Sequence, residues 1–306
     1  MLSYQKELAK SFLNVYWIRL ETAIWRTLDV LEMKHVKFNH PIIDMGCADG
    51  IFSFIRFGGK FDLGFDTFRI KNAINGFHTG RDIYDQVTNY KPKILKKPKD
   101  RIDVGLDWKI NLLKKAKKLN FYDKHIQHDL NKPLPFEDNS FATIFSNVYY
   151  WVENLPKLLK ESNRILKEDG KLILIVPDAN FKKWLIYNRY LNRGQKWAKI
   201  LDRGQYHNMK HCYSYTKWKK LFLNAGFAIE KHSSYLTKGF LQYCDIASRP
   251  YSPYMIEIVN RIPEKVRRYI KLKLIEDFLP IISSYIESTE KSSSKTGYHL
   301  FVLKKC

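Results

Sequence analysis

The sequence lacks any apolar run close to the roughly 20 residues that a membrane-spanning helix requires. Its longest uninterrupted apolar run is Leu172 to Val176. Cysteine is also scarce: the four cysteines, at positions 47, 212, 244 and 306, are scattered and form no C-x-x-C pair. This spacing argues against a disulfide framework and against a zinc site. The N-terminus shows no basic region followed by an apolar stretch and a cleavage site, so we expect a cytoplasmic protein.

Acidic residues are scarce in the last third of the chain. Residues 181–306 carry 24 Lys and Arg against 9 Asp and Glu, whereas residues 1–180 carry 29 against 22. Most of the net charge of +22 therefore lies in the last third. Such an excess is typical of proteins with an anionic partner: a nucleic acid, an anionic membrane surface or an acidic substrate. A genome that favours lysine gives the same composition, and the sequence leaves both interpretations open.

The chain has 306 residues, 45% of them hydrophobic, which is enough for one large domain with a substantial addition. The stretch from Ile42 to Gly50 organises it, because a buried strand runs there into a turn with glycines at 46 and 50, and a helix begins at Ile51. Glycine permits the positive φ angles and close contacts that such a turn needs. Asp44, at the end of the strand, favours a cationic ligand over a phosphate.

Two acids are candidates for the end of the second strand, where a nucleoside-binding α/β domain places a carboxylate for ribose hydroxyls. Asp66 comes first, but only about two helical turns precede it, and a parallel crossover usually needs a dozen or more residues. Asp107 opens a strongly amphipathic helix that leads to a third strand. We therefore predict that Asp107 ends the second strand, that residues 58–102 are an insertion, and that Asp66 lies on a solvated surface.

The rest of the core continues as strand, helix, strand. A third strand ends near Asp129, a fourth covers 142–147, a helix covers 155–166 and a fifth strand covers 171–176. This alternation is typical of a doubly wound parallel sheet, whose ligands bind at the carboxyl ends of the strands.

Five segments within residues 40–180 closely resemble, in order, those of class I S-adenosylmethionine-dependent methyltransferases of the small-molecule type. They are 44–50 (DMGCADG), 105–107 (GLD) with Leu113 and Ala116, 129–136, 141–147 and 161–170 (E-x-x-R-x-L-K-x-x-G). The resemblance implies an α/β fold with a Rossmann-like, mostly parallel seven-stranded sheet, helices on both faces, and helical additions before the last strands. It also implies S-adenosyl-L-methionine as the cofactor.

The resemblance also assigns roles to individual residues. Asp44 and Gly46 would face the methionine end of the cofactor, Asp107 the ribose hydroxyls and Asp129 the adenine amine. The full set of cofactor-binding candidates is Asp44, Gly46, Cys47, Ala48, Gly50, Asp107, Trp108, Asp129, Leu130, Ser146 and Asn147. Two features depart from the family: Ala48 takes the place of the middle glycine, and the 58–102 insertion is unusual.

The segment after the fourth strand argues against a nucleic-acid substrate. Residues 147–151 lack the Asn/Asp-Pro-Pro-aromatic pattern of nucleic-acid amino methyltransferases, and no cysteine stands where a pyrimidine C5-methylating nucleophile would. We therefore expect methyl transfer, at oxygen, to a small-molecule or a glycan- or lipid-linked acceptor. Two alternatives stay open: an RNA methyltransferase, and a catalytically silent cofactor-binding protein that interacts through its basic face.

The predicted organisation has three parts: an N-terminal helical segment at 1–38, the cofactor-binding core at 39–180, and basic substrate-side helices with the final strands of the sheet at 181–306. The helical pattern in residues 3–34 fits either a lid over the ligand cleft or a helix that packs against the domain.

Residues 253–288 combine helical periodicity with charge. An apolar stripe, which includes Val266 and Ile270, opposes a basic face. The basic face consists of Arg267, Arg268, Lys271 and Lys273. It fits either a solvated surface or peripheral attachment to an anionic membrane.

His211 and Tyr150 are the candidate catalytic residues. His211 follows the fifth strand, where members of the resembled family place acceptor-facing residues, and an imidazole accepts a proton near neutral pH. Its alternative role is to cap the helix that begins near Tyr215. Tyr150 follows the fourth strand and would only orient the acceptor, because a phenol with a pKa of about 10 is a poor base. His207 stands four residues before His211, but no third ligand accompanies them, so we predict no metal site.

Overall fold

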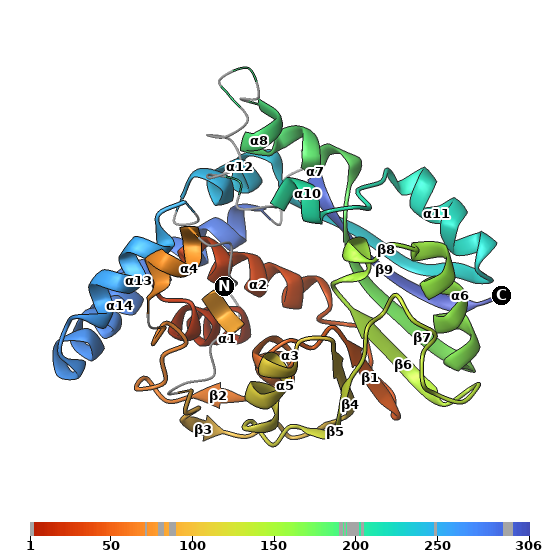
Figure 1. The fold of residues 1–306 in the computed structure, drawn as a ribbon, viewed down its shortest axis with the longest axis horizontal. Coiled ribbons are helices and arrows are strands. Elements are labelled where there is room, and N and C mark those ends of the chain that lie inside the picture. The colour runs from red at the N-terminus through yellow and green to blue at the C-terminus, as the bar shows by residue number, and fades with distance from the viewer. Residues whose placement is uncertain are drawn as a thin grey trace.

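The computed structural model describes residues 3–70, 72–78, 83–85, 90–189, 192, 194, 202, 205–247, 250–289 and 296–306. Its centre is a seven-stranded sheet with the order β5-β4-β1-β6-β7-β9-β8 (Figure 1). The strands are β1 (Ile42–Met45), β4 (Ile102–Asp107), β5 (Tyr122–Gln127), β6 (Phe141–Ser146), β7 (Leu166–Pro177), β8 (Phe227–Thr237) and β9 (Thr296–Lys305). The first five pair in parallel, and β9 is antiparallel to both β7 and β8, which confirms the predicted fold class.

The register of β1 sets the position of the site. Met45 pairs with Leu106 of β4 on one side and with Ser146 of β6 on the other. The carboxyl ends of all three strands therefore meet at one edge of the sheet. The helices that follow these strands are α3 (Ile51–Arg56), α5 (Ile110–Lys117) and α6 (Leu155–Ile165).

The N-terminal segment forms two helices, α1 (Ser3–Val15) and α2 (Leu20–Glu32), rather than one continuous helix. The chain turns at residues 16–19, and the two helices reach different parts of the molecule. Both helices contact the long helix α14 (Glu264–Thr289), but only α1 also contacts α3, whereas α2 contacts β8 and α12 (Lys238–Ile246).

The insertion forms a small unit of its own. It contains β2 (Lys60–Phe61), α4 (Ala73–His78), the 3₁₀ helix η1 (Ile83–Asp85) and β3 (Ile94–Lys96). Among the described residues, strands β2 and β3 pair with each other in an antiparallel two-stranded sheet that is separate from the central sheet. Asp107 ends β4, the neighbour of β1, so the choice of Asp107 over Asp66 for the second strand is confirmed.

Within the described residues, seven helices lie in the chain before and between the final strands. Helices α7 (Ala179–Trp184), α8 (Ile186–Arg189), α10 (Gln205–Asn208) and α11 (Tyr215–Asn224) lie in the chain between β7 and β8, and α12, α13 (Ser252–Asn260) and α14 between β8 and β9. Figure 1 shows α13 and α14 near α4 and the N-terminal helices, on the opposite side of the molecule from α6 and α11. In the part of the chain that the structure describes, no helix is both long and apolar enough to span a bilayer.

The predicted orientation of α14 is right for Arg268 and Lys273, which are exposed, and wrong for the other two cations of the basic face. Arg267 and Lys271, assigned to a solvated basic face, are 3% and 2% exposed, whereas Val266 and Ile270 of the predicted apolar stripe are 46% and 37% exposed. The reversal has a physical cause, because a buried cation is tolerated when its partners are supplied. Residues of the insertion are partners of both cations.

The insertion supplies a carboxylate to Arg267 and main-chain carbonyls to Lys271. Asp66 Oδ2 accepts a hydrogen bond from Arg267 Nε at 2.5 Å, and Lys271 Nζ donates to Phe65 O at 2.6 Å. The prediction that Asp66 lies on a solvated surface is therefore also wrong. Residues 251–289 hold six Lys and Arg against five Asp and Glu, so the loss of two cations to the interior leaves this surface without its predicted positive charge.

Candidate active site

The turn after β1 takes positive φ at three positions. Gly46 and Gly50 have φ of +82° and +77°, and Ala48 between them has φ of +50°. A Cβ at Gly46 would lie 2.3 Å from Val148 Cγ2, so a side chain does not fit there. Ala48 carries a methyl group in the left-handed region, at a cost of about 1–2 kcal/mol. The turn that the glycine spacing predicts is therefore present.

Asp107 joins this turn to the end of β4. Its Oδ2 accepts a hydrogen bond from Ala48 N at 2.9 Å, and its Oδ1 accepts one from Lys109 N at 2.8 Å. The residue is 6% exposed, and burial raises the pKa of its carboxyl group. An ionised carboxylate has about four lone-pair sites, so two amide bonds leave capacity for two hydroxyl donors. This acceptor set fits the ribose of the predicted cofactor.

Main-chain hydrogen bonds hold three strand ends together. Gly46 N and Cys47 N both donate to Leu106 O, at 2.7 and 3.0 Å, and His128 N donates to Asp107 O at 3.1 Å. The turn after β1, the end of β4 and the segment after β5 therefore form one continuous edge. Cys47 is almost buried there, and burial raises the pKa of its thiol.

The segment after β5 lies on the outer part of this edge. Asp129 Oδ1 accepts hydrogen bonds from Asn131 N and Asn131 Nδ2, both at 2.9 Å, and these bonds hold the pKa of its carboxyl group below the usual value. Leu130, the next residue, is half-buried. Gln127 Nε2 donates to Trp108 O at 3.1 Å, which places the 65% exposed Trp108 beside this segment.

Asp44 engages one of its two carboxylate oxygens inside the protein. It is 3% exposed, and its Oδ2 accepts hydrogen bonds from Ser53 Oγ at 2.6 Å and Tyr122 OH at 2.8 Å. Burial raises the pKa of the Asp44 carboxyl group to about 6, even though these bonds favour the ionised form. The contacts tie β1 to α3 and β5 and give Asp44 a role in holding the turn.

The end of β6 continues the edge on the other side of β1. Ser146 is buried; its Oγ donates to Met45 O at 2.8 Å and accepts from Val148 N at 3.2 Å. Its contacts therefore fix the main chain before the next residue, Asn147. Asn147 is half-buried and lines a cavity.

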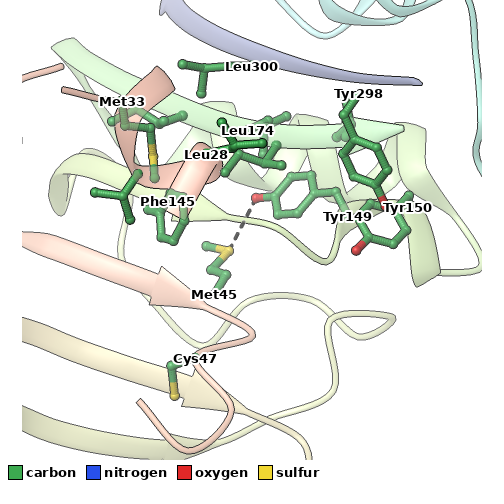
Figure 2. Packing of buried hydrophobic residues seen from close by; sticks show 14 of the residues in the cluster. Leu28, Met33, Met45, Cys47, Phe145, Tyr149, Tyr150, Leu174, Tyr298 and Leu300 are labelled. Atoms are coloured by element: carbon green, nitrogen blue, oxygen red, sulfur yellow. Dashed lines mark hydrogen bonds between the residues drawn. The ribbon is translucent and has the colours of Figure 1, made fainter. Parts of the chain in front are cut away.

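This cavity of about 240 Å³ lies between the segment after β6 and helix α2. Its lining includes both predicted residues Asn147 and Tyr150. The lining residues are Arg19, Thr22, Trp25, Arg26, Asn147, Tyr150, Trp151, Ile175, Gln205, Asn208, Met209 and Tyr298. Figure 2 shows Tyr150 beside Tyr298, whereas the Tyr149 hydroxyl points toward Met45, 3.3 Å from its sulfur.

Helix α2 forms one wall of the cavity. The sequence did not predict which residues of this helix would line a ligand site. Arg19, Thr22 and Arg26 follow one another at helical spacing of three and four, and Trp25 lies beside them. This pattern of polar and aromatic residues on one helix face is the feature of the sequence that could have indicated a cavity wall. The two alternatives for the N-terminal segment therefore divide between its helices: α1 packs against the domain, and α2 lies over the cavity.

His211 lies outside the residues that line this cavity. Its Nε2 is 2.9 Å from Val152 O and its Nδ1 is 2.8 Å from Tyr213 OH. A carbonyl can only accept, so Nε2 carries the proton and Nδ1 accepts from the tyrosine hydroxyl. Burial lowers the pKa of the imidazole. The arrangement leaves His211 no unengaged nitrogen to take a proton from an acceptor.

His211 does not cap the following helix either. Helix α11 begins after Ser214, which is its N-cap residue. The main chain at His211 instead donates to Tyr150 O at 3.1 Å, so this segment supports the Tyr150 side of the cavity. Among the described residues, no group of three or more His, Cys, Asp or Glu is placed to hold a metal ion.

Comparison with known protein families shows which family the chain belongs to. A family profile described as "Methyltransferase domain" matches residues 16–232, more than two thirds of the chain. The chain belongs to this family of S-adenosylmethionine-dependent methyltransferases. The match spans α2, the glycine turn, Asp107 and the segment after β6, so it includes most of the edge described above. No curated protein matches the methyltransferase.

Several solved structures are similar to this methyltransferase, all at low identity. An S-adenosylmethionine-dependent methyltransferase from Mesorhizobium loti has 14% identity and a TM-score of 0.47, covering 92% of this chain and 97% of that one. Geranyl diphosphate C-methyltransferase from Streptomyces coelicolor has 9% identity and a TM-score of 0.45, covering 95% and 82%. The YcgJ protein from Bacillus subtilis has 12% identity and a TM-score of 0.43, covering 92% and 98%. These likenesses are too weak to carry an argument about the acceptor.

Proposed function

We propose that this methyltransferase transfers a methyl group to an oxygen atom of a small-molecule or a glycan- or lipid-linked acceptor that binds in the cavity under α2. The observation that carries the proposal is the position of the cavity. It shares Asn147 with the edge formed by the strand ends, and Tyr150, Trp151 and Tyr298 give it aromatic walls. An acceptor there would lie beside the cofactor site, as direct transfer requires.

The cofactor supplies a methyl group activated by a sulfonium ion. We assign the ribose hydroxyls to Asp107, whose two oxygens face the turn and α5 and keep acceptor capacity. The turn at 46–50 lets main chain approach the ligand closely, because Gly46 and Gly50 have no side chain. Trp108, Asp129 and Leu130 form the adenine side of the site in this proposal.

Tyr150 is the residue that we assign to the positioning of the acceptor. Burial raises the pKa of its phenol to about 12, so the hydroxyl keeps its proton at neutral pH and donates a hydrogen bond. It stands in the cavity wall, and its ring lies 6.3 Å from that of Tyr298, centroid to centroid. His211 is not proposed as the base, because both of its ring nitrogens are engaged.

The test is methyl transfer itself. Purified protein and methyl-tritiated S-adenosylmethionine are incubated with an extract of cells that lack this protein, and labelled products are separated by size and polarity. We expect label in a small-molecule or glycolipid fraction that is absent with the Asp107→Ala variant. Cofactor binding by calorimetry without any labelled product would contradict the proposal and favour a catalytically silent binding protein. Label in the RNA fraction would assign the acceptor to nucleic acid.

A further inference from the structure

Among the described residues that line the cavity, no side chain is able to act as a general base. Among the described residues that line it, none is an aspartate, glutamate, histidine, lysine or cysteine. The two ionisable acids are Tyr150 and Tyr298, and burial raises the pKa of both phenols above the ordinary value. An acceptor that must lose a proton during transfer, such as an alcohol, finds no partner for that proton among these described residues.

The same walls carry two guanidinium groups. Arg26 is paired with Asp29 through one nitrogen, Nη1, at 2.9 Å, and the Arg26 side chain remains 34% exposed. Arg19 donates from Nε to Glu21 at 3.0 Å and from Nη1 to Tyr84 OH at 3.1 Å, and its side chain is 16% exposed. Each guanidinium has five N–H donors, so the bonds of Arg26 through one nitrogen and of Arg19 through two leave donors on both side chains for a further acceptor.

The acidic partners of these arginines are turned away from the cavity. Asp29 is fully buried, and its Oδ1 accepts a hydrogen bond from Tyr235 OH at 2.7 Å. Glu21 is 2% exposed. Neither residue lines the cavity, so a ligand meets the guanidinium groups rather than the carboxylates. Planar N–H pairs of arginine match the two oxygens of a carboxylate.

We propose, on the basis of the function proposed above, that the acceptor is a carboxylic acid with an apolar body and that the product is its methyl ester. The acid is already ionised at neutral pH, so no base is needed. One carboxylate oxygen forms a bond to the methyl carbon, the carbon–sulfur bond breaks, and the sulfur keeps the electron pair as a neutral thioether. No proton is released. The arginines hold the second oxygen, and Trp25, Trp151 and Tyr298 contact the body of the acid.

Binding is tested with three acids and matched neutral compounds. Phenylacetate, 4-hydroxybenzoate and decanoate are titrated into the protein loaded with S-adenosylhomocysteine, and tryptophan fluorescence is followed, because Trp25 and Trp151 line the cavity. Phenylacetamide, 4-hydroxybenzamide and decanamide are the controls. We expect at least one acid to bind 10-fold or more tightly than its amide. If none of the acids exceeds its amide, the proposal is overturned.

The arginine is tested by Arg26→Gln. A lost charge-assisted hydrogen bond corresponds to about a 10- to 150-fold weaker affinity for the acid, with little change for the amide. Because this variant leaves Asp29 buried without a cation, the double variant Arg26→Gln with Asp29→Asn removes both charges and keeps the test valid if the single variant fails to fold. Arg261→Gln, at a 78% exposed side chain on the surface of the protein, is the matched control. If Arg26→Gln weakens the cofactor and leaves the acid unaffected, Arg26 belongs to the cofactor and the proposal fails.

The chemistry is tested on 4-hydroxybenzoate, which offers a carboxylate and a phenol on one ring, and on the extract described above. A methyl ester releases tritiated methanol in mild alkali, whereas a methyl ether or methylamine does not. We expect alkali-labile label in both experiments. Alkali-stable label overturns the carboxylate and leaves methyl transfer intact, whereas a protein that binds cofactor but labels nothing contradicts the proposed function itself.

Discussion

The two halves of the proposed ligand-binding edge, which we call the cofactor half and the acceptor half, are built in different ways. The cofactor half consists of the turn at 46–50, Asp107 and the segment at 127–131, joined largely by main-chain hydrogen bonds. The acceptor half consists of side chains from α2, the segment after β6, β7, α10 and β9. Short local motifs therefore shape one half, whereas the other exists only when five separate segments come together. A third region, where the insertion meets α14, belongs to neither half. Variants in this region should therefore change stability without changing the affinity for either ligand.

The largest effect is expected in that third region. Arg267→Ala leaves Asp66 buried without its cation, and Asp66 also accepts from Trp17 Nε1 at 3.2 Å. Removing one partner of a buried ion pair typically costs about 3–5 kcal/mol of unfolding free energy. Urea unfolding measures this, with Arg268→Ala as the exposed control on the same helix. The affinities for cofactor and acceptor should not change in protein that remains folded; a specific loss of either would assign α14 to the site.

The turn of the cofactor half should show a characteristic pH dependence of stability. Burial raises the pKa of Asp44 from 3.8 to about 6 in the folded protein. Between these values the folded state holds a proton that the unfolded state has released, so this group makes stability fall as pH rises from about 4 to about 6. At about 1.4 kcal/mol for each pKa unit, the total is about 3 kcal/mol.

The variant Asp44→Asn isolates this contribution. Its amide stays neutral at every pH, so its stability relative to the wild type should improve steadily from pH 4 to pH 6.5. Urea unfolding at four pH values gives the difference directly. A difference that is constant with pH, or that runs the other way, would show that Asp44 is not held in the buried network with Ser53 and Tyr122.

Asp107 tests whether the cofactor half acts alone. The loss of hydrogen bonds between a charged carboxylate and hydroxyl donors costs about 1.5–3 kcal/mol, so Asp107→Ala should weaken cofactor binding about 10- to 150-fold. Calorimetry with S-adenosylhomocysteine measures this, and Asp123→Ala, an exposed residue near the start of β5, is the control. Phenylacetate affinity of the free protein should be unaffected. Equal losses for both ligands would mean that the two halves are not separable.

Tyr150 tests the acceptor half and should give the smallest effect. Tyr150→Phe keeps the ring in the wall and removes one hydroxyl, which is worth about 0.5–1.5 kcal/mol as a neutral hydrogen bond. We expect the KM for the acceptor to rise about 2- to 10-fold with kcat nearly unchanged, in steady-state methyl-transfer assays. A fall of more than 100-fold in kcat would place the phenol in the chemistry rather than in positioning.

The sequence predicted correctly those features that short local motifs determine. The glycine turn, the parallel order of β1 and β4 and the position of Asp107 all followed from short motifs and from helix length. The prediction for α14 was wrong where helical periodicity alone placed Arg267 and Lys271 in water. The pattern could not include Asp66 and the carbonyl of Phe65, which lie some 200 residues earlier in the chain and stabilise these cations.

The sequence by itself determined the α/β core, because periodicity, the glycines at 46 and 50 and the acid at 107 act within a few residues of one another. Only the tertiary structure decided three other features. It engaged Oδ2 of Asp44 with Ser53 and Tyr122, engaged both nitrogens of His211, and brought Arg26 and Tyr150 to the lining of one cavity. The physical reason is that a side chain's direction and charge depend on what packs against it, and those neighbours come from distant parts of the chain.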